Sequence, residues 1–219
     1  MSRVAIIGGH GKVALHLTKI LTSQGHQVSS IFRNQDHAAD VEQVGGTPVV
    51  ADVAELSVEQ MADLFRGHDA VVWSAGAGGS SPEATYAVDR DAAIRSMDAA
   101  TEASIGRYVM VSYLGAGKDH GVPKDNGFFH YAEAKAAADE HLRKSELAWT
   151  ILGPGSLTTD PGTGKIEVSD KPQRNSVPRE DVAHVAAVVL GDLGTVDKTF
   201  QFNSGETPIA EAIEGVLQS

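Results

Sequence analysis

The stretch that decides the fold is Val4-Ala5-Ile6-Ile7-Gly8-Gly9-His10-Gly11-Lys12-Val13-Ala14, residues 4–14. Its unbroken apolar run, residues 4–7, is typical of a strand buried on both faces, as in parallel sheets. Glycines follow at once, and helical spacing of apolar residues begins at Val13. This order favours a dinucleotide site, because glycines permit positive φ and let pyrophosphate approach the backbone, while the helix start supplies amides. The expected contacts are Gly8, Gly9, His10, Gly11, Lys12 and Val13.

An ordinary turn between a strand and a helix is the simpler interpretation of the same glycines. A glycine pattern alone is a weak signal, and the required context of strand, loop and helix strengthens it here. His10 could contact a phosphate or face solvent, and the sequence leaves both open.

Outward from this stretch, strand-like and helix-like segments alternate about six times, which predicts right-handed βαβ crossovers. We expect an α/β protein with a single doubly wound parallel sheet, a Rossmann fold, and a small C-terminal region on the substrate side. No linker divides the chain, so residues 1–219 form one predicted domain. The expected strands are 4–7, 28–32, 47–50, 70–73, 107–111, 147–152 and 199–202, and the longer expected helices are 12–22, 57–65, 82–104, 129–145, 178–190 and 208–217.

Composition narrows the function classes. The chain carries a formal net charge of −11 and no cysteine. An acidic chain repels phosphate backbones, so we expect no nucleic-acid partner. The absence of cysteine excludes disulfides and thiolate ligands, the nine histidines form no metal-ligand motif, and we expect no metal site. No apolar run is long enough for a membrane span or a secretory signal, so we expect a cytoplasmic protein with no membrane partner.

Arg33 follows the second expected strand, where the adenosine ribose of a Rossmann cofactor lies. An arginine at this place accommodates a 2′-phosphate, whereas an acidic residue would bind the 2′-hydroxyl of NAD. We therefore expect NADP(H), with NAD(H) as the less favoured cofactor. The alternative is that Arg33 is only a solvated loop cation. Asp36 is a second candidate for the ribose, although it looks better placed as a helix N-cap.

Tyr131 and Lys135 are four residues apart in an expected helix and so share one face. A nearby ammonium would lower the pKa of the phenol and ease proton exchange with a carbonyl oxygen. Ser112, just after an expected strand, could hydrogen-bond the same oxygen. Taken alone, a tyrosine and a lysine at this spacing can also be a coincidence on an exposed face.

Together these residues resemble the short-chain dehydrogenase/reductase superfamily over nearly the whole chain. The similarity is greatest to its atypical, NAD(P)H-binding branch, which is related to NAD-dependent epimerases/dehydratases. The residues that carry the resemblance, in chain order, are Gly8, Gly11, Ala14, Arg33, Asp52, Ser74, Ala75, Gly76, Ser112, Tyr131, Lys135, Pro154 and Gly155.

The resemblance implies roles for several residues. Tyr131 would be the acid/base, Ser112 would orient the substrate, and Lys135 would hold the nicotinamide ribose. Three departures are Ala14 for the third glycine, Asp89 where the catalytic tetrad has asparagine, and a short chain after the proline motif. The implied cofactor contacts are Asp52 and Val53 near the adenine, Ser74, Ala75, Gly76 and Ala77 along the cofactor, and Pro154, Gly155 and Ser156 near the nicotinamide.

The leading functional hypothesis is an NADPH-dependent reductase of a small carbonyl, quinone or similar acceptor. A non-catalytic NADP(H) sensor and an epimerase or dehydratase of a small sugar are the alternatives. We expect the glycine- and charge-rich loop 115–127 to be a mobile cover over the substrate side. The pattern leaves the substrate and the oligomeric state open.

Overall fold

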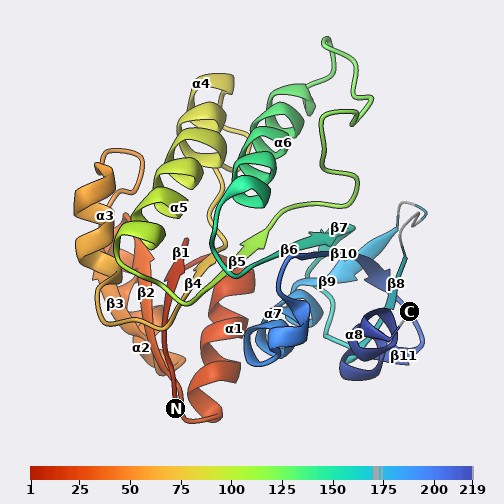
Figure 1. The fold of residues 1–219 in the computed structure, drawn as a ribbon, viewed down its shortest axis with the longest axis horizontal. Coiled ribbons are helices and arrows are strands. Elements are labelled where there is room, and N and C mark those ends of the chain that lie inside the picture. The colour runs from red at the N-terminus through yellow and green to blue at the C-terminus, as the bar shows by residue number, and fades with distance from the viewer. Residues whose placement is uncertain (170–172, 174, 219) are drawn as a thin grey trace.

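The computed structural model describes residues 1–169, 173 and 175–218. Within these residues, nine strands form one sheet in the order β11-β8-β10-β6-β5-β4-β1-β2-β3 (Figure 1). The sheet strands are β1 (Arg3–Ile7), β2 (Gln27–Phe32), β3 (Thr47–Val50), β4 (Ala70–Trp73), β5 (Arg107–Val111), β6 (Trp149–Pro154), β8 (Lys165–Val168), β10 (Lys198–Ser204) and β11 (Thr207–Pro208). The chain reverses its strand order beside β1, and this switch point places the start of the first helix at the carboxyl edge of the sheet.

The expected doubly wound sheet is confirmed, but it is not wholly parallel. Strands β1 to β6 and β10 pair in parallel, with Val4 opposite both Val28 and Ala70. Beyond β10, strand β8 pairs with β10 in the antiparallel direction, and β11 pairs with β8 in the antiparallel direction. A separate parallel pair, β7 (Ser156–Thr158) with β9 (Ser176–Pro178), lies just after β6. Helix α7 lies between β9 and β10 in the chain, so β8 and β10 pair across a long connection.

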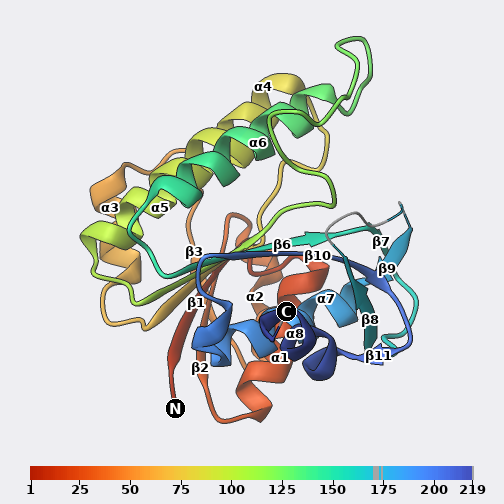
Figure 2. The same cartoon turned by 45° about the vertical axis from the view of Figure 1, so that its right-hand side comes forward.

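Helices cover both faces of the sheet. Figure 2 shows α3, α4, α5 and α6 on one side and α1, α2, α7 and α8 on the other. Their bounds are α1 (Lys12–Ser23), α2 (Ala38–Gln43), α3 (Val58–Phe65), α4 (Pro82–Thr85), α5 (Ala93–Glu102), α6 (Phe129–Lys144), α7 (Arg179–Gly191) and α8 (Ile209–Leu217).

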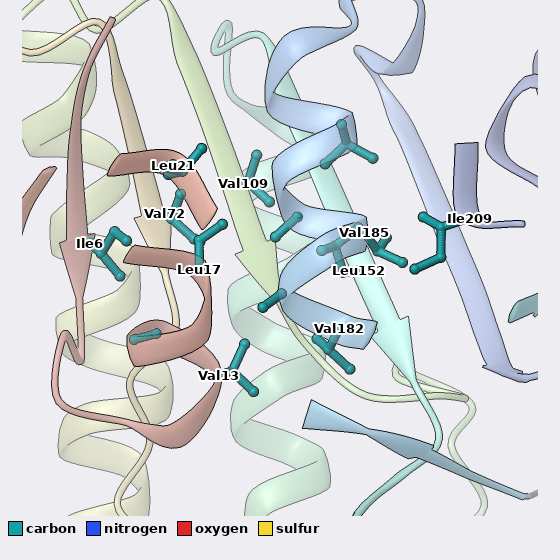
Figure 3. Close-up of a cluster of buried hydrophobic side chains, with 14 of the residues drawn as sticks. Ile6, Val13, Leu17, Leu21, Val72, Val109, Leu152, Val182, Val185 and Ile209 are labelled. Carbon is teal, nitrogen blue, oxygen red and sulfur yellow. The ribbon is translucent and has the colours of Figure 1, made fainter. Parts of the chain in front are cut away.

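Strand β1 shows why its sequence is apolar without interruption. Val4 and Ile6 face the core beneath α1 and α7, whereas Ala5 and Ile7 face the core beneath α3, α5 and α6. Figure 3 shows the first of these cores, with Ile6 beside Leu17 of α1 and Val72 of β4, and with Val182 and Val185 of α7 near Leu152 of β6. Burial on both faces anchors the glycine loop that follows β1.

Three local predictions are corrected by the structure. The expected helix 82–104 is interrupted by a π-helical segment, Tyr86–Ala92, between α4 and α5. The expected strand 147–152 is shifted to Trp149–Pro154, since β6 continues through Gly153 and Pro154. Asp36 is not an N-cap. The side chain of Asn34 accepts the Asp36 amide instead and starts the 3-10 turn Gln35–His37.

Among the described residues, no helix has the length and apolar character needed to cross a bilayer.

Candidate cofactor and substrate site

The loop between β1 and α1 is shaped by contacts that exclude side chains. Gly8 has φ +79°, and a Cβ there would lie 2.6 Å from the Ala75 backbone. A Cβ on Gly9 would lie 2.5 Å from Ser30 Cβ. Both glycines donate their amides to Ile31 O, at 3.0 and 2.9 Å. The glycines therefore let the loop sit against the ends of β2 and β4.

Helix α1 begins without a side-chain cap, as do α2, α5, α6, α7 and α8. Its N-cap is Gly11, no side chain caps it, and its first turn carries no acidic residue. By contrast, Ser57 and Gln60 form a capping box at α3, and Ser81 caps α4. Uncapped amides and the positive end of the helix dipole suit a phosphate group.

A cavity of about 330 Å³ runs beside this loop and along the ends of β2, β3 and β4. A concave, mostly apolar cleft with a few polar groups at this sheet edge is typical of dinucleotide sites. The predicted cofactor contacts that line it are Gly8, His10, Gly11, Arg33, Asp52, Val53, Ser74, Ala75, Gly76 and Ala77. The structure thus brings together most of the predicted cofactor residues.

Three predicted cofactor residues of the glycine loop and the start of α1 do not line this cavity. Gly9 is buried against Ser30, and the Val13 side chain belongs to the core, so Val13 has only its amide to offer. Lys12 lines a neighbouring hollow with His16, Lys19 and others, outside the 330 Å³ cavity.

His10 is held by its own neighbours. Its Nε2 lies 2.8 Å from Asp40 Oδ2, and its ring stacks on His37 with centroids 3.6 Å apart. His37 and Asn34 also line the cavity and were not predicted. Asp36, the alternative ribose partner, is not among the lining residues.

A second cavity, of about 460 Å³, lies at the carboxyl ends of β5 and β6. The predicted residues Ser112, Tyr131, Pro154, Gly155 and Ser156 line it. Its other walls are residues that the sequence analysis missed, namely Tyr113, Leu114, Phe128, Leu157, Asn175 and Arg179. Helix α6 supplies Tyr131 from one layer and α7 supplies Arg179 from the other (Figure 2).

Lys135, one turn after Tyr131 on α6, is fully buried and is not among the residues that line either cavity. Its Nζ donates to Val111 O at 3.0 Å and lies 3.2 Å from Met110 Sδ. Burial lowers the pKa of Lys135, while the carboxylates of Asp139 and Asp89 raise it. The Lys135 ammonium therefore forms a hydrogen bond with the backbone at the end of β5 and interacts electrostatically with the buried acids Asp139 and Asp89.

The expected lowering of the Tyr131 pKa by Lys135 is wrong in this structure. Burial raises the pKa of Tyr131, and the negative charges of Asp89 and Asp139 raise it further. Desolvation penalises the phenolate, and nearby anions do the same. Tyr131 is therefore kept protonated at neutral pH.

Asp139 is the functional candidate that the sequence analysis missed. Ser112 Oγ donates to Asp139 Oδ2 at 2.6 Å in a buried environment. Burial raises the pKa of Asp139, with Lys135 and the Ser112 hydrogen bond acting in the opposite direction. Asp139 stands four residues after Lys135 on α6, so extending the Tyr131–Lys135 spacing by one turn would have found it.

Asp89 lies in the π-helical segment Tyr86–Ala92 and is buried. Its Oδ2 accepts the Ala77 amide at 3.0 Å, and its Oδ1 would lie 3.1 Å from a Cβ on Gly76. Among the described residues, Oδ1 has no hydrogen-bond partner. Burial raises the pKa of this carboxyl. π-Helical turns occur frequently at functional sites, and this one places an acid under the cofactor loop Ser74–Ala77.

Loop 115–127 extends beyond the start of α6 (Figure 1). His120 Nε2 lies 2.7 Å from Glu133 Oε1, and Lys118 Nζ lies 3.2 Å from Glu140 Oε1. These contacts attach the loop to α6, and Phe128, just after it, lines the second cavity. Its expected mobility stays a prediction.

These features define a Rossmann protein with a dinucleotide cleft. The NAD(P)H-binding family matches residues 8–192, and the chain belongs to this family. YhfK of Bacillus subtilis, named as an uncharacterized sugar epimerase, is 34% identical over 97% of this chain and 99% of its own.

Two solved structures are also similar to this chain in fold and in sequence. A Bacillus halodurans protein, provisionally assigned as an NAD-dependent epimerase/dehydratase, has a TM-score of 0.91 and 34% identity over 98% of this chain and 100% of its own. The oxidoreductase ylbE of Lactococcus lactis has a TM-score of 0.89 and 28% identity over 99% of this chain and 97% of its own.

Proposed function

We propose that this protein is an NADP(H)-dependent reductase of a small carbonyl, quinone or similar acceptor. The observation that carries the proposal is the position of Tyr131, whose phenol lies in the wall of the second cavity together with Ser112. A neutral phenol is a proton donor, which is what reduction of a carbonyl requires. The ylbE oxidoreductase at 28% identity supports the same class of reaction.

The residues around the first cavity fit a dinucleotide. The amides at the start of α1 would hold the pyrophosphate, and Ser74–Ala77 would line its path toward the second cavity. Arg33 is exposed on the cavity wall, where a guanidinium can meet a 2′-phosphate in two hydrogen bonds. This supports NADP(H) over NAD(H).

The nicotinamide, when bound, supplies or accepts a hydride. In reduction, the Tyr131 hydroxyl would donate its proton to the oxygen of the acceptor as the acceptor carbon takes up the hydride. Solvent then returns a proton to the phenolate. Lys135 and Asp139 follow Tyr131 on α6. Lys135 donates to Val111 O at the end of β5, and Asp139 accepts the hydrogen bond that holds Ser112 in the cavity wall.

The test is a screen of NADPH oxidation against aldehydes, ketones, quinones and flavins, followed by Tyr131→Phe. We expect the variant to lose roughly 10²–10⁴-fold in turnover, the range for a positioned acid, with an unchanged Kd for NADPH. Tyr86→Phe is the control, because its hydroxyl bonds His130 Nδ1 and does not line the second cavity.

Two results would overturn the proposal. Full activity in Tyr131→Phe would remove the phenol from the reaction. Tight NADPH binding without turnover of any acceptor would favour the non-catalytic sensor.

An epimerase acting on a small sugar is the second candidate, and the name of YhfK favours it. An epimerase returns the hydride to the same molecule, so it converts substrate without net change in NADPH absorbance. The same screen, with product analysis of sugars incubated with NADP⁺, separates the two reactions.

A further inference from the structure

Arg179 contributes a guanidinium to the second cavity and has few partners of its own. It is the first residue of α7 and is half-buried. Its Nη1 donates to Leu157 O at 3.1 Å. Among the described residues, Arg179 makes no ion pair. Since a guanidinium has five donors, most of them are available to a ligand.

Most of the remaining walls of the cavity are aromatic or apolar, and Ser112, Ser156 and Asn175 add uncharged polar groups. The rings of Tyr113 and Phe128 meet edge to face with centroids 5.1 Å apart, and Phe128 and Tyr131 are also 5.1 Å apart. Phe128 and Leu157 expose 41% and 36% of their surface at the rim, so this part of the protein presents apolar area to solvent. Exposed apolar surface beside a cavity marks a ligand-binding region.

Arg179 is also the one charged residue among the described residues that line this cavity. The chain as a whole has a formal net charge of −11. An acidic surface repels anions, so an anionic ligand needs a cation placed at its site. A guanidinium binds a carboxylate in two parallel hydrogen bonds, and it is the side chain best matched to that group.

We propose that the second cavity binds a planar, largely apolar substrate that carries a carboxylate, and that Arg179 binds this carboxylate. The inference rests on the proposed reductase function and names its substrate class. Tyr131 would meet the reducible group from α6, while Arg179 would meet the acid from α7. The aromatic rings would cover the body of the substrate between them.

The other anion within reach of such a cation is the cofactor pyrophosphate. Arg179 also lines the hollow that contains Lys12, which follows the glycine loop. The cavity along the dinucleotide cleft, however, does not include Arg179, and the hollow with Lys12 also contains Asp160 and Glu180. The positions therefore favour the substrate over the cofactor.

The experiment compares ligands that match in shape and differ in charge: 4-formylbenzoate with 4-formylbenzamide, and 1-naphthoate with 1-naphthamide. Binding to the complex of the full chain with NADP⁺ is measured by calorimetry at fixed ionic strength, which needs no turnover. The kcat/KM for the two aldehydes is measured by NADPH oxidation. The variants are Arg179→Gln, which removes the charge, and Arg179→Lys, which keeps it. Arg66→Gln is the matched control, since Arg66 is the exposed C-cap residue of α3, pairs with Asp63 and does not line the second cavity.

We expect the wild type to bind the carboxylates about 10- to 100-fold more tightly than the amides, the range for a hydrogen bond to a charged group. Arg179→Gln should abolish this preference, Arg179→Lys should keep part of it, and Arg66→Gln should keep all of it. The Kd for NADPH should not change in any variant.

The inference is wrong if neither pair shows the preference, or if the preference survives in Arg179→Gln. It is also wrong if Arg179→Gln weakens NADPH binding and leaves the ligand ratio intact, because the guanidinium then serves the cofactor. Carboxylate preference without NADPH oxidation would retain the inference and reject the reductase. Turnover of both aldehydes at equal kcat/KM would retain the reductase and reject the inference.

Discussion

Gly8→Ala tests whether the fold of the glycine loop is what creates the cofactor cleft. Gly8 combines two constraints, a φ of +79° and a position against the end of β4. An alanine Cβ would lie 2.6 Å from Ala75 Cα and N, and 2.8 Å from the Ser74 carbonyl carbon. These are backbone atoms, so no side chain can turn away to make room.

The size of the effect follows from these two constraints. A left-handed conformation costs alanine roughly 1–2 kcal/mol. Ordinary contact begins at 3.4 Å, so the gap to Ala75 must open by 0.8 Å, from 2.6 to 3.4 Å. Overpacking of this kind adds about 1–3 kcal/mol. Because Ala75 lines the dinucleotide cavity, the displacement should reach the cofactor and raise the Kd for NADPH at least about 10-fold, the equivalent of 1.4 kcal/mol.

Gly25→Ala is the matched control. Gly25 follows α1 with a φ of +83°, and nothing lies within 4 Å of a Cβ built there. This variant should lose only the 1–2 kcal/mol of backbone strain and keep its NADPH affinity. Urea unfolding gives the stabilities, and fluorescence titration gives the two Kd values. Equal losses of stability and of NADPH affinity in the two variants would refute the argument from the contact with Ala75.

Three further predictions concern the cofactor, the buried acid and the far end of the sheet. The wild type should prefer NADPH over NADH by about 10-fold, which is the low end of the range for a hydrogen bond to a charged group, because Arg33 is exposed. Arg33→Ala should lower this preference to near one. The two Kd values at fixed ionic strength decide this, and a preference that survives the mutation contradicts it. Burial raises the Asp139 pKa, so the folded protein binds a proton that the unfolded chain has lost, and wild-type stability falls as pH rises above 3.8. In Asp139→Asn this pH-dependent loss is absent. As the pH rises above 3.8, the stability of the variant relative to wild type should therefore increase, by at most about 1.4 kcal/mol per pH unit. Urea unfolding measures this difference in stability, and a difference that does not change with pH would contradict the prediction. Arg107→Met should lose at least about 3 kcal/mol of stability, because Arg107 donates to Ala148 O and Val189 O at 2.7 and 3.0 Å and removing it leaves buried acceptors unpaired. Its NADPH affinity should be unchanged, since Arg107 starts β5 at the opposite edge from the cofactor, and a large loss of affinity would show that this edge is coupled to the site.

The pKa of Arg107 illustrates how burial acts without a facing acid. Burial lowers it to about 10, and the more distant charges of Asp192 and Asp197 raise it. The guanidinium stays charged at neutral pH, and its two Nη atoms donate to neutral oxygens, while Nε has no hydrogen-bond partner among the described residues. Stability, and not catalysis, is the property that its removal should change.

The sequence by itself determined the layers and the cofactor edge of this protein. An apolar run at residues 4–7 must be buried on both faces, and the glycines after it can be replaced only at steric cost, so both are visible in local pattern. Helical spacing likewise placed Tyr131 and Lys135 on one face of α6. These inferences depend on residues close in the chain, where backbone geometry alone sets which side chains are neighbours.

Only the tertiary structure decided what surrounds those residues. It placed Arg179, from α7, in the same cavity as Tyr131, from α6. It also brought Ser112 into contact with Asp139, 27 residues away. The direction of the Tyr131 pKa shift shows the consequence. Sequence spacing predicted a lower value from Lys135, but desolvation by the folded core and two acids raised it. Burial and long-range contacts set the free energy of a charge, and neither exists until the layers have packed around it.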